Sequence, residues 1–174
     1  MTFPAQSPSN PMPGFRFAVA FSEGTDVAGA VGGKGVTTLS AGFQEVSGLE
    51  TTLEIHEYKE GGRNDFTHKL ATQVNFGNVT FKRGVALTPD LWRWYNEVRR
   101  GNFGARRSIV VAQLDYAGNA ALVWTLSRAL PAKYTGPSWN AGQSAVAIES
   151  LEVAHEGLEL TEGSDFALSL GQGG

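Results

Sequence analysis

Glutamate is the residue type that could do chemistry here, because Glu45, Glu50, Glu54, Glu57 and Glu60 lie close together. Two neighbouring carboxyl groups can serve as general acid and general base, as in glycoside hydrolases. The hydrophobic pattern has a period of two, which predicts a strand with Glu50 and Glu54 on one face. At ~3.3 Å per residue they lie about 13 Å apart, too far to form a pair unless a second strand supplies a partner. The pattern favours a solvated polar face.

Other patterns for catalysis, metal binding or cofactor binding have little support. The chain has no cysteine, and its three histidines (His56, His68 and His155) show no metal-ligand spacing. No G-x-S-x-G motif occurs, and "AGAVGGKG" departs from a phosphate-binding loop at Ala28 and Gly35. We therefore expect no enzyme activity, cofactor or metal. The alternative is a small β-sandwich carbohydrate-binding module or carboxylate-based hydrolase that uses the glutamates.

Composition and charge describe a globular chain without a general affinity for nucleic acid. The net charge is −3 over 174 residues, and no apolar run approaches the ~20 residues that cross a bilayer. The N-terminus has no secretory-signal pattern, so we expect no membrane anchor. Basic residues do cluster at Arg93, Arg99, Arg100, Arg106 and Arg107. They suit either a phosphate-contacting patch or, as we favour, a helix end and strand start facing water or a neighbouring subunit.

The pattern along the chain predicts one domain. Residues 1–14 are rich in proline and predict an extended arm, and residues 161–174 predict a flexible tail. The domain between them, residues 15–160, contains a long glycine-rich loop at 23–42. Within it, period-two or continuous apolar segments predict strands. These strands cover residues 15–22, 49–60 and 78–84, a hairpin within 106–130, and 145–160.

The strand predicted around residues 49–60 has a second, apolar face. It carries Leu49, Thr51, Leu53 and Ile55. Alternation slips near residues 149–150 of the last strand, which predicts a β-bulge there. The segments 61–77 and 131–144 predict loops.

One helix is expected, at about residues 89–100. Thr88 suits the N-cap, Pro89 the first helical position, and Gly101 the position after the end. An apolar stripe follows at i, i+3, i+4 and i+7. The fold class is therefore mainly β: an antiparallel β-barrel or sandwich with one flanking α-helix.

Complementary charge suggests that copies of the chain associate with one another. Residues 45–60 are acidic, whereas residues 82–83 and 93–107 are basic. Mating these two unlike surfaces would give a heterologous contact, which generates rings. On composition alone, the chain is a self-associating β domain.

Several linked motifs resemble one known family. They are "GFQEVSGLE", "EYKEGG", "VTFKRG", "LWRWYNEVRRG", "RALPAKYTGPSWNA" and "VAIESLEVAHEGLE", in this order. The chain resembles the tail-tube proteins of contractile-tailed phages and the inner-tube proteins of phage-tail-like contractile injection systems. The resemblance spans roughly residues 15–160. Two departures are the long insertion around residues 24–41 and Ala71–Thr72, where the family often has Pro-Gly.

The resemblance implies a structural subunit that forms homo-hexameric rings stacked into a hollow tube. The implied partners are a sheath, baseplate or spike and tube-capping proteins, with DNA or protein cargo transiently in the lumen. Assembly in the bacterial cytoplasm and a place in a virion tail or injection particle follow from the same likeness. A tube-initiating or tube-capping paralogue, and more distantly a type VI secretion ring protein, remain open within this class.

The resemblance also implies which residues line the lumen or the contacts between subunits. The expected set combines the acidic strand and its loop with the basic strand that could pair with them. It comprises Glu45, Glu50, Glu54, Glu57, Tyr58, Lys59, Arg63, Lys82 and Arg83.

Overall fold

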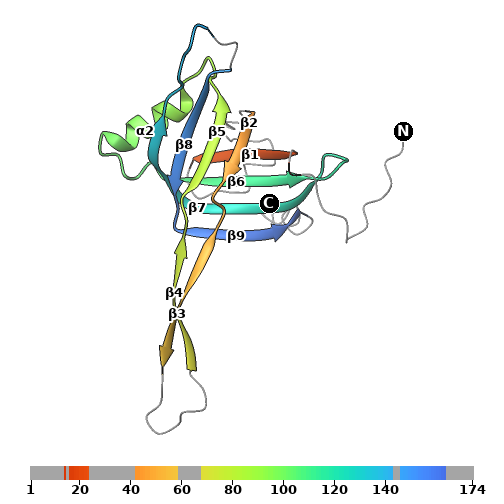
Figure 1. Ribbon diagram of the computed structural model, residues 1–174, viewed down its shortest axis with the longest axis vertical. Coiled ribbons are helices and arrows are strands. Elements are labelled where there is room, and N and C mark those ends of the chain that lie inside the picture. The colour runs from red at the N-terminus through yellow and green to blue at the C-terminus, as the bar shows by residue number, and fades with distance from the viewer. Residues whose placement is uncertain (1–13, 15, 24–41, 59–67, 143–145, 164–174) are drawn as a thin grey trace, which may run out of the picture.

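The computed structural model describes residue 14 and residues 16–23, 42–58, 68–142 and 146–163. The expected N-terminal arm, glycine-rich loop and tail lie almost wholly outside these residues, although Thr161 and Glu162 belong to the last strand. Figure 1 shows the arrangement of the elements. They are β1 (Phe17–Glu23), β2 (Phe43–Ser47), β3 (Thr51–Tyr58), β4 (His68–Phe76), β5 (Val79–Gly84), α2 (Asp90–Arg99), β6 (Arg107–Leu114), β7 (Ala120–Thr135), β8 (Ile148–Ala154) and β9 (Gly157–Glu162).

Two antiparallel sheets share the long strand β7. The first part of β7 pairs with β6 and β9, and β6 pairs with β1. The last part of β7 pairs with β8, followed by β5 and β2. Between the two parts Arg128 has a φ of +53°, and the register shifts at Pro131–Lys133. We call β1–β6–β7–β9 sheet A and β2–β5–β8–β7 sheet B; their strands run crosswise in Figure 1.

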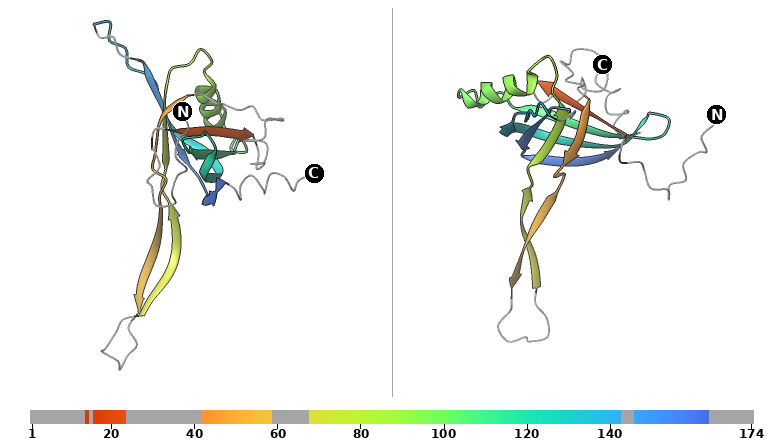
Figure 2. Two further views of the ribbon diagram at one scale, coloured as in Figure 1. Left: turned by 90° about the vertical axis from the view of Figure 1, so that its right-hand side faces the viewer. Right: turned by 45° about the horizontal axis from the view of Figure 1, so that its top comes forward.

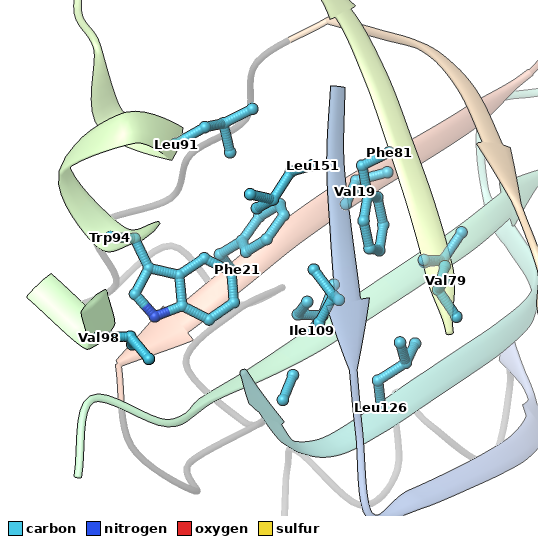
Figure 3. Packing of buried hydrophobic residues seen from close by; sticks show 13 residues of the cluster. Val19, Phe21, Val79, Phe81, Leu91, Trp94, Val98, Ile109, Leu126 and Leu151 are labelled. Carbon is cyan, nitrogen blue, oxygen red and sulfur yellow. The ribbon is translucent and has the colours of Figure 1, made fainter. Parts of the chain in front are cut away.

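The core fills the space between the sheets and α2. Phe21 of sheet A lies at the centre of this core (Figure 3). Its ring centroid is 5.5 Å from that of Phe81 in sheet B and 5.7 Å from that of Trp94 in the helix. All three side chains are almost fully buried. Truncation of such an aromatic residue costs about 3–5 kcal/mol, so this cluster fixes how the helix sits on the sheets.

Helix α2 buries the apolar stripe that the sequence predicted, and it begins at Asp90, one residue later than expected. Leu91, Trp94 and Val98 are buried, and the indole Nε1 of Trp94 donates a hydrogen bond to the carbonyl of Ala105 at 2.7 Å. Pro89 occupies the N-cap position in place of Thr88, whose hydroxyl is committed to the side chain of Asp90. The expected glycine after the helix is confirmed, because Gly101 has a φ of +102°.

Two loop predictions are wrong in part. Residues 68–76 form β4, which pairs with β3 and makes a two-stranded hairpin that projects from the sandwich (Figure 2). Residues 131–135 continue β7, because β8 supplies a hydrogen-bonding partner beyond the register shift. In both segments a neighbouring strand overrides a polar or proline-containing local sequence.

The β-bulge predicted near residues 149–150 is also wrong. Strand β8 pairs with β5 without a register shift, from Gly84↔Ile148 to Val79↔Val153. The apparent slip arises because Glu149 occupies an inward position and is 4% exposed. The regular strand therefore places a carboxylate inside the protein.

Candidate assembly surfaces

The outer face of sheet B is polar and carries paired charges. Glu45 and Lys82 are opposite each other in the β2–β5 ladder and form an ion pair at 2.8 Å. On β8, Glu152 accepts a hydrogen bond from Asn78 at 2.8 Å and is opposite Lys133 of β7 in the ladder. We expected the acidic segment 45–60 and the basic segment 82–83 to form contacts between copies, but Glu45 and Lys82 form an ion pair within one chain.

Arg83 has a different place from the one expected. It is 1% exposed, and its Nε donates to Glu149 Oε1 at 2.7 Å, so its guanidinium lies inside the sandwich and not on a lumen or subunit surface. Tyr134 donates its hydroxyl proton to Glu149 Oε2 at 2.7 Å. Burial, followed by this bond and the carboxylate charge, raises the pKa of Tyr134 from 10.0 to about 12. On β5 every second residue from Val79 points into the core, and Arg83 is one of these inward residues.

The β3–β4 hairpin is exposed on both faces. Glu54 is opposite Gln73, and Glu57 is opposite Lys69, so the cross-strand neighbour of Glu54 is not a carboxylate. Tyr58 ends β3 and is half exposed. The hairpin thus brings together no pair of cross-strand carboxylates for acid–base chemistry, and the register shifts after Glu54.

Glu50 lies at the junction between sheet B and the hairpin. Its carbonyl accepts a hydrogen bond from Gly77 at 3.1 Å, which links the two strands where β2 passes into β3 and β4 into β5. Gly48 has a φ of +90° at the same junction. Lys59 and Arg63 lie outside the described residues, so their placement stays a prediction.

A second charged cluster lies at the β8–β9 turn. Glu156 forms ion pairs with Arg106 and with Arg128, the latter at 2.6 Å. The hydrogen bond from Arg128 is the main reason that the pKa of Glu156 is lowered. Arg106 also donates to the carbonyl of Arg128. This cluster stabilises the turn of β7 where the chain passes from sheet A to sheet B.

The remaining basic residues near the helix also have local roles. Arg107 lies over the indole of Trp94, 5.0 Å from the ring centroid, and Arg93 forms an ion pair with Asp90 at 3.6 Å. Arg99 donates two hydrogen bonds to the Asn96 side chain. The preference for a helix end and strand start facing water or a neighbouring subunit, over a phosphate-contacting patch, stays a prediction.

Neither a metal site nor a membrane helix is found among the described residues. No group of three or more His, Asp or Glu side chains in that part of the chain is arranged to hold a metal ion. No described helix is long and apolar enough to cross a membrane.

Sheet B has two unlike edges. Within the described residues, β2 pairs only with β5, and residues 131–135 of β7 pair only with β8. Sequence reasoning missed the second edge, because residues 131–135 were predicted to be loop. Among the described residues, these two edges leave backbone groups free to pair with a further strand.

Comparison with known proteins identifies the family. The family model described as T4-like virus tail tube protein gp19 matches residues 13–159. The chain therefore belongs to the T4-like tail tube protein family. No curated protein matches the chain.

Solved structures agree with this assignment. A chain of the anti-feeding prophage baseplate, determined with six-fold symmetrisation, has 29% identity and a TM-score of 0.72, covering 88% of this chain and 97% of that one. A chain of the extracellular contractile injection system PVC sheath–tube complex has 22% identity and a TM-score of 0.72, covering 89% and 94%. Hcp1 from Flavobacterium johnsoniae shares the fold at 13% identity and a TM-score of 0.52, covering 86% and 97%.

Proposed function

We propose that the chain forms homo-hexameric rings that stack into the hollow inner tube of a phage tail or contractile injection particle. The observation that carries the proposal is the pair of unlike open edges on sheet B. Contact between the β2 edge of one copy and the β7 edge of the next is heterologous, and such contacts form a ring when the rotation between neighbouring copies closes.

Strand direction agrees with such a ring. Every neighbouring pair in β2–β5–β8–β7 is antiparallel, so β2 and β7 run in opposite directions. When copies share one orientation, β7 of one copy and β2 of the next are therefore antiparallel as well, and one continuous sheet results. Closure removes the open edges, which otherwise favour aggregation. The six-fold symmetry of the related baseplate supports six copies per ring.

The polar outer face of sheet B supports its role as the lumen wall. Glu45, Lys82, Glu152 and Lys133 lie on it, Glu54 lies on β3, and Glu50 lies at the junction between the two. Solvated charged side chains on that face suit the passage of DNA or protein cargo. A sheath, baseplate and cap are the partners, and assembly takes place in the bacterial cytoplasm. No observation favours the carbohydrate-binding or hydrolase alternative.

Negative-stain electron microscopy of the purified protein, with its mass measured in solution, tests this proposal. Hollow rings or tubes of six-fold symmetry are the expected result. A strict monomer at high concentration, both alone and with baseplate protein added as a nucleus, would overturn it. Rings of another symmetry would overturn the hexamer.

A further inference from the structure

Three aromatic side chains form a cluster at the β7 edge of sheet B. Trp92 and Tyr95 come from α2, and Tyr134 comes from the last part of β7. The ring centroid of Trp92 lies 5.2 Å from that of Tyr134 and 5.8 Å from that of Tyr95. Trp92 is nevertheless 40% exposed. We call these three residues the aromatic cluster. An exposed tryptophan beside an open strand edge is a stiff apolar group of the kind that anchors protein interfaces.

The aromatic cluster lies on the core side of sheet B. Tyr134 is opposite the buried Leu151 in the β7–β8 ladder, and its hydroxyl donates to the inward Glu149. Figure 1 shows α2 beside the last part of β7, on the side away from β8. The cluster therefore stands at the edge that a neighbouring strand would extend, in the layer behind the polar outer face.

A pocket of about 280 Å³ lies at the other edge of sheet B, beside β2. Its apolar walls come from both sheets and comprise Phe17, Val46, Leu49, Val111 and Trp124. Val46 is opposite the buried Phe81 in the β2–β5 ladder, so its side chain faces the core side. On sheet A, Phe17 is in phase with the buried Val19 and Phe21. We call this space the β2 pocket, and it lies between the two sheets on the core side of β2.

Pairing of the two edges of sheet B would bring the cluster and the pocket together. Adjacent strands lie about 4.8 Å apart, and side chains on the same face of two paired strands are neighbours. Tyr134 and Val46 both face the core side, which is common to all copies in one continuous sheet. Figure 1 shows β1 and β6 extending past β2 on the side away from β5, which places this part of sheet A under the neighbour's α2.

We propose that the aromatic cluster of one copy docks into the β2 pocket of the next copy in the same ring. Trp92 is the member that enters the pocket, because it is the most exposed of the three and the pocket walls are apolar. The inference rests on the proposed ring and adds a contact between side chains to the pairing of backbone edges. A buried aromatic side chain removes roughly 150–250 Å² from solvent, so one such anchor contributes substantially to each joint.

This contact fixes a geometry that strand pairing leaves open. Every exposed edge presents the same row of N–H and C=O groups, so backbone pairing alone does not select one partner edge. A slip of two residues along the joint also leaves the same side chains facing the core. An anchor in a pocket fixes both the register of the joint and the angle between neighbouring copies. It thereby favours the rotation that closes a ring over an open or aggregated sheet.

Photochemical cross-linking tests the contact while keeping an aromatic ring at the anchor position. Trp92 is replaced by p-benzoylphenylalanine, and this variant is assembled with an excess of wild-type protein labelled with ¹⁵N. Irradiation should join residue 92 to a ¹⁵N-labelled chain at residues 46–49, 111–113 or 124, as assigned by fragmentation in mass spectrometry. The isotope shows that the two residues belong to different copies. The same replacement at Trp139, a tryptophan that is 80% exposed and does not line the pocket, is the matched control and should not label these residues.

The outcomes separate this contact from the ring on which it rests. Rings in which residue 92 does not label the β2 pocket, or labels it no more than residue 139 does, would overturn the contact and leave the proposed ring intact. Cross-links confined to unlabelled chains, despite the excess of ¹⁵N protein, would place residue 92 against its own copy and would also overturn it. Wild-type protein that never assembles, even with baseplate protein added as a nucleus, would overturn the ring and this contact together.

Truncation of the anchor gives a second measurement. Trp92→Ala should raise the protein concentration at which half of the subunits are in rings by about tenfold or more, as for other truncated aromatic anchors. Trp92→Phe keeps a ring and should recover part of this loss, whereas Trp139→Ala should leave the midpoint unchanged. An unchanged midpoint for Trp92→Ala would overturn the proposal. Melting of the unassembled subunit checks that the variant folds, and the cross-link decides the question even if it does not.

Discussion

Removal of one partner from the buried Arg83–Glu149 pair should strongly destabilise the subunit. Glu149→Gln keeps the shape of the side chain and an oxygen that can accept from Tyr134, but it removes the negative charge. Arg83 would then remain charged at 1% exposure, and its Nη2 has no hydrogen-bond partner among the described atoms. The variant therefore leaves a buried charge without its counterion, and its amide NH2 group cannot accept the hydrogen bond from Arg83 Nε.

The magnitude follows from the burial of both partners. Their side chains are 1% and 5% exposed, and breaking such a pair costs about 3–5 kcal/mol. In a chain of this length, each kcal/mol lowers the melting temperature by roughly 2–4 °C. We therefore expect a decrease of roughly 6–20 °C, measured by circular dichroism on unassembled protein at neutral pH.

A double replacement distinguishes charge pairing from simple packing. Arg83→Met/Glu149→Leu removes both charges and retains apolar volume, so it should recover most of the lost stability. Glu45→Gln is the matched surface control, because the Glu45–Lys82 pair is about half exposed and should cost less than about 1 kcal/mol. A Glu149→Gln variant as stable as wild type, or a double variant no more stable than the single one, would refute this reasoning.

Three further outcomes are expected. Gly48→Ala should lower the free energy of unfolding in urea by more than about 2 kcal/mol, because its φ is +90° and its new Cβ would collide with a backbone carbonyl. Gly101 has a similar φ without such a contact, so Gly101→Ala should cost only about 1 kcal/mol. Equal costs for the two variants would contradict the collision. Tyr134 should ionise at about pH 12 in an ultraviolet titration, above its ordinary value of 10.0. Because folding raises its pKa from 10.0 to about 12, this contribution to stability is complete below pH 10 and is lost between pH 10 and 12; Tyr134→Phe should weaken that alkaline loss. Glu50→Lys/Glu54→Lys should leave the monomer folded and disturb tube assembly or cargo passage, and normal tubes that still pass cargo would count against a role for these charges.

Periodicity predicted the parts of the fold in which burial and local sequence agree. The apolar stripe of α2 and the hairpin of β6 and β7 are of this kind, and Gly118 at its turn has a φ of +91°. Strand β4 was missed because its sequence, HKLATQVNF, mixes polar and apolar residues, and all of it except Phe76 is exposed. Only pairing with β3 makes it a strand, and pairing between segments distant in sequence leaves little local trace.

The candidate residues also divide into those whose burial agrees with the prediction and those whose burial does not. Glu54 is exposed, as its place on the polar face of the predicted strand implied, and the Lys82 side chain is 41% exposed. The resemblance placed Arg83 at the lumen or the subunit contacts, whereas its inward phase on β5 buries it. The inward phase of Glu149 is the matching signal. Two opposite charges at inward positions of two strands were the available indication of a buried pair.

The buried pair also fixes which side chains the tube wall presents. Arg83 and Glu149 are directly opposite each other in the β5–β8 ladder. A slip of one residue would turn every side chain of β5 to the other face, burying Lys82 and leaving Glu149 without its partner. A purely apolar inner face would also resist a slip of one residue, but it would tolerate a slip of two, because one apolar residue then replaces another there. The same ion pair that costs free energy to bury therefore fixes the register of β5 against β8 and keeps Lys82 on the outer face, where the proposed lumen needs solvated charge.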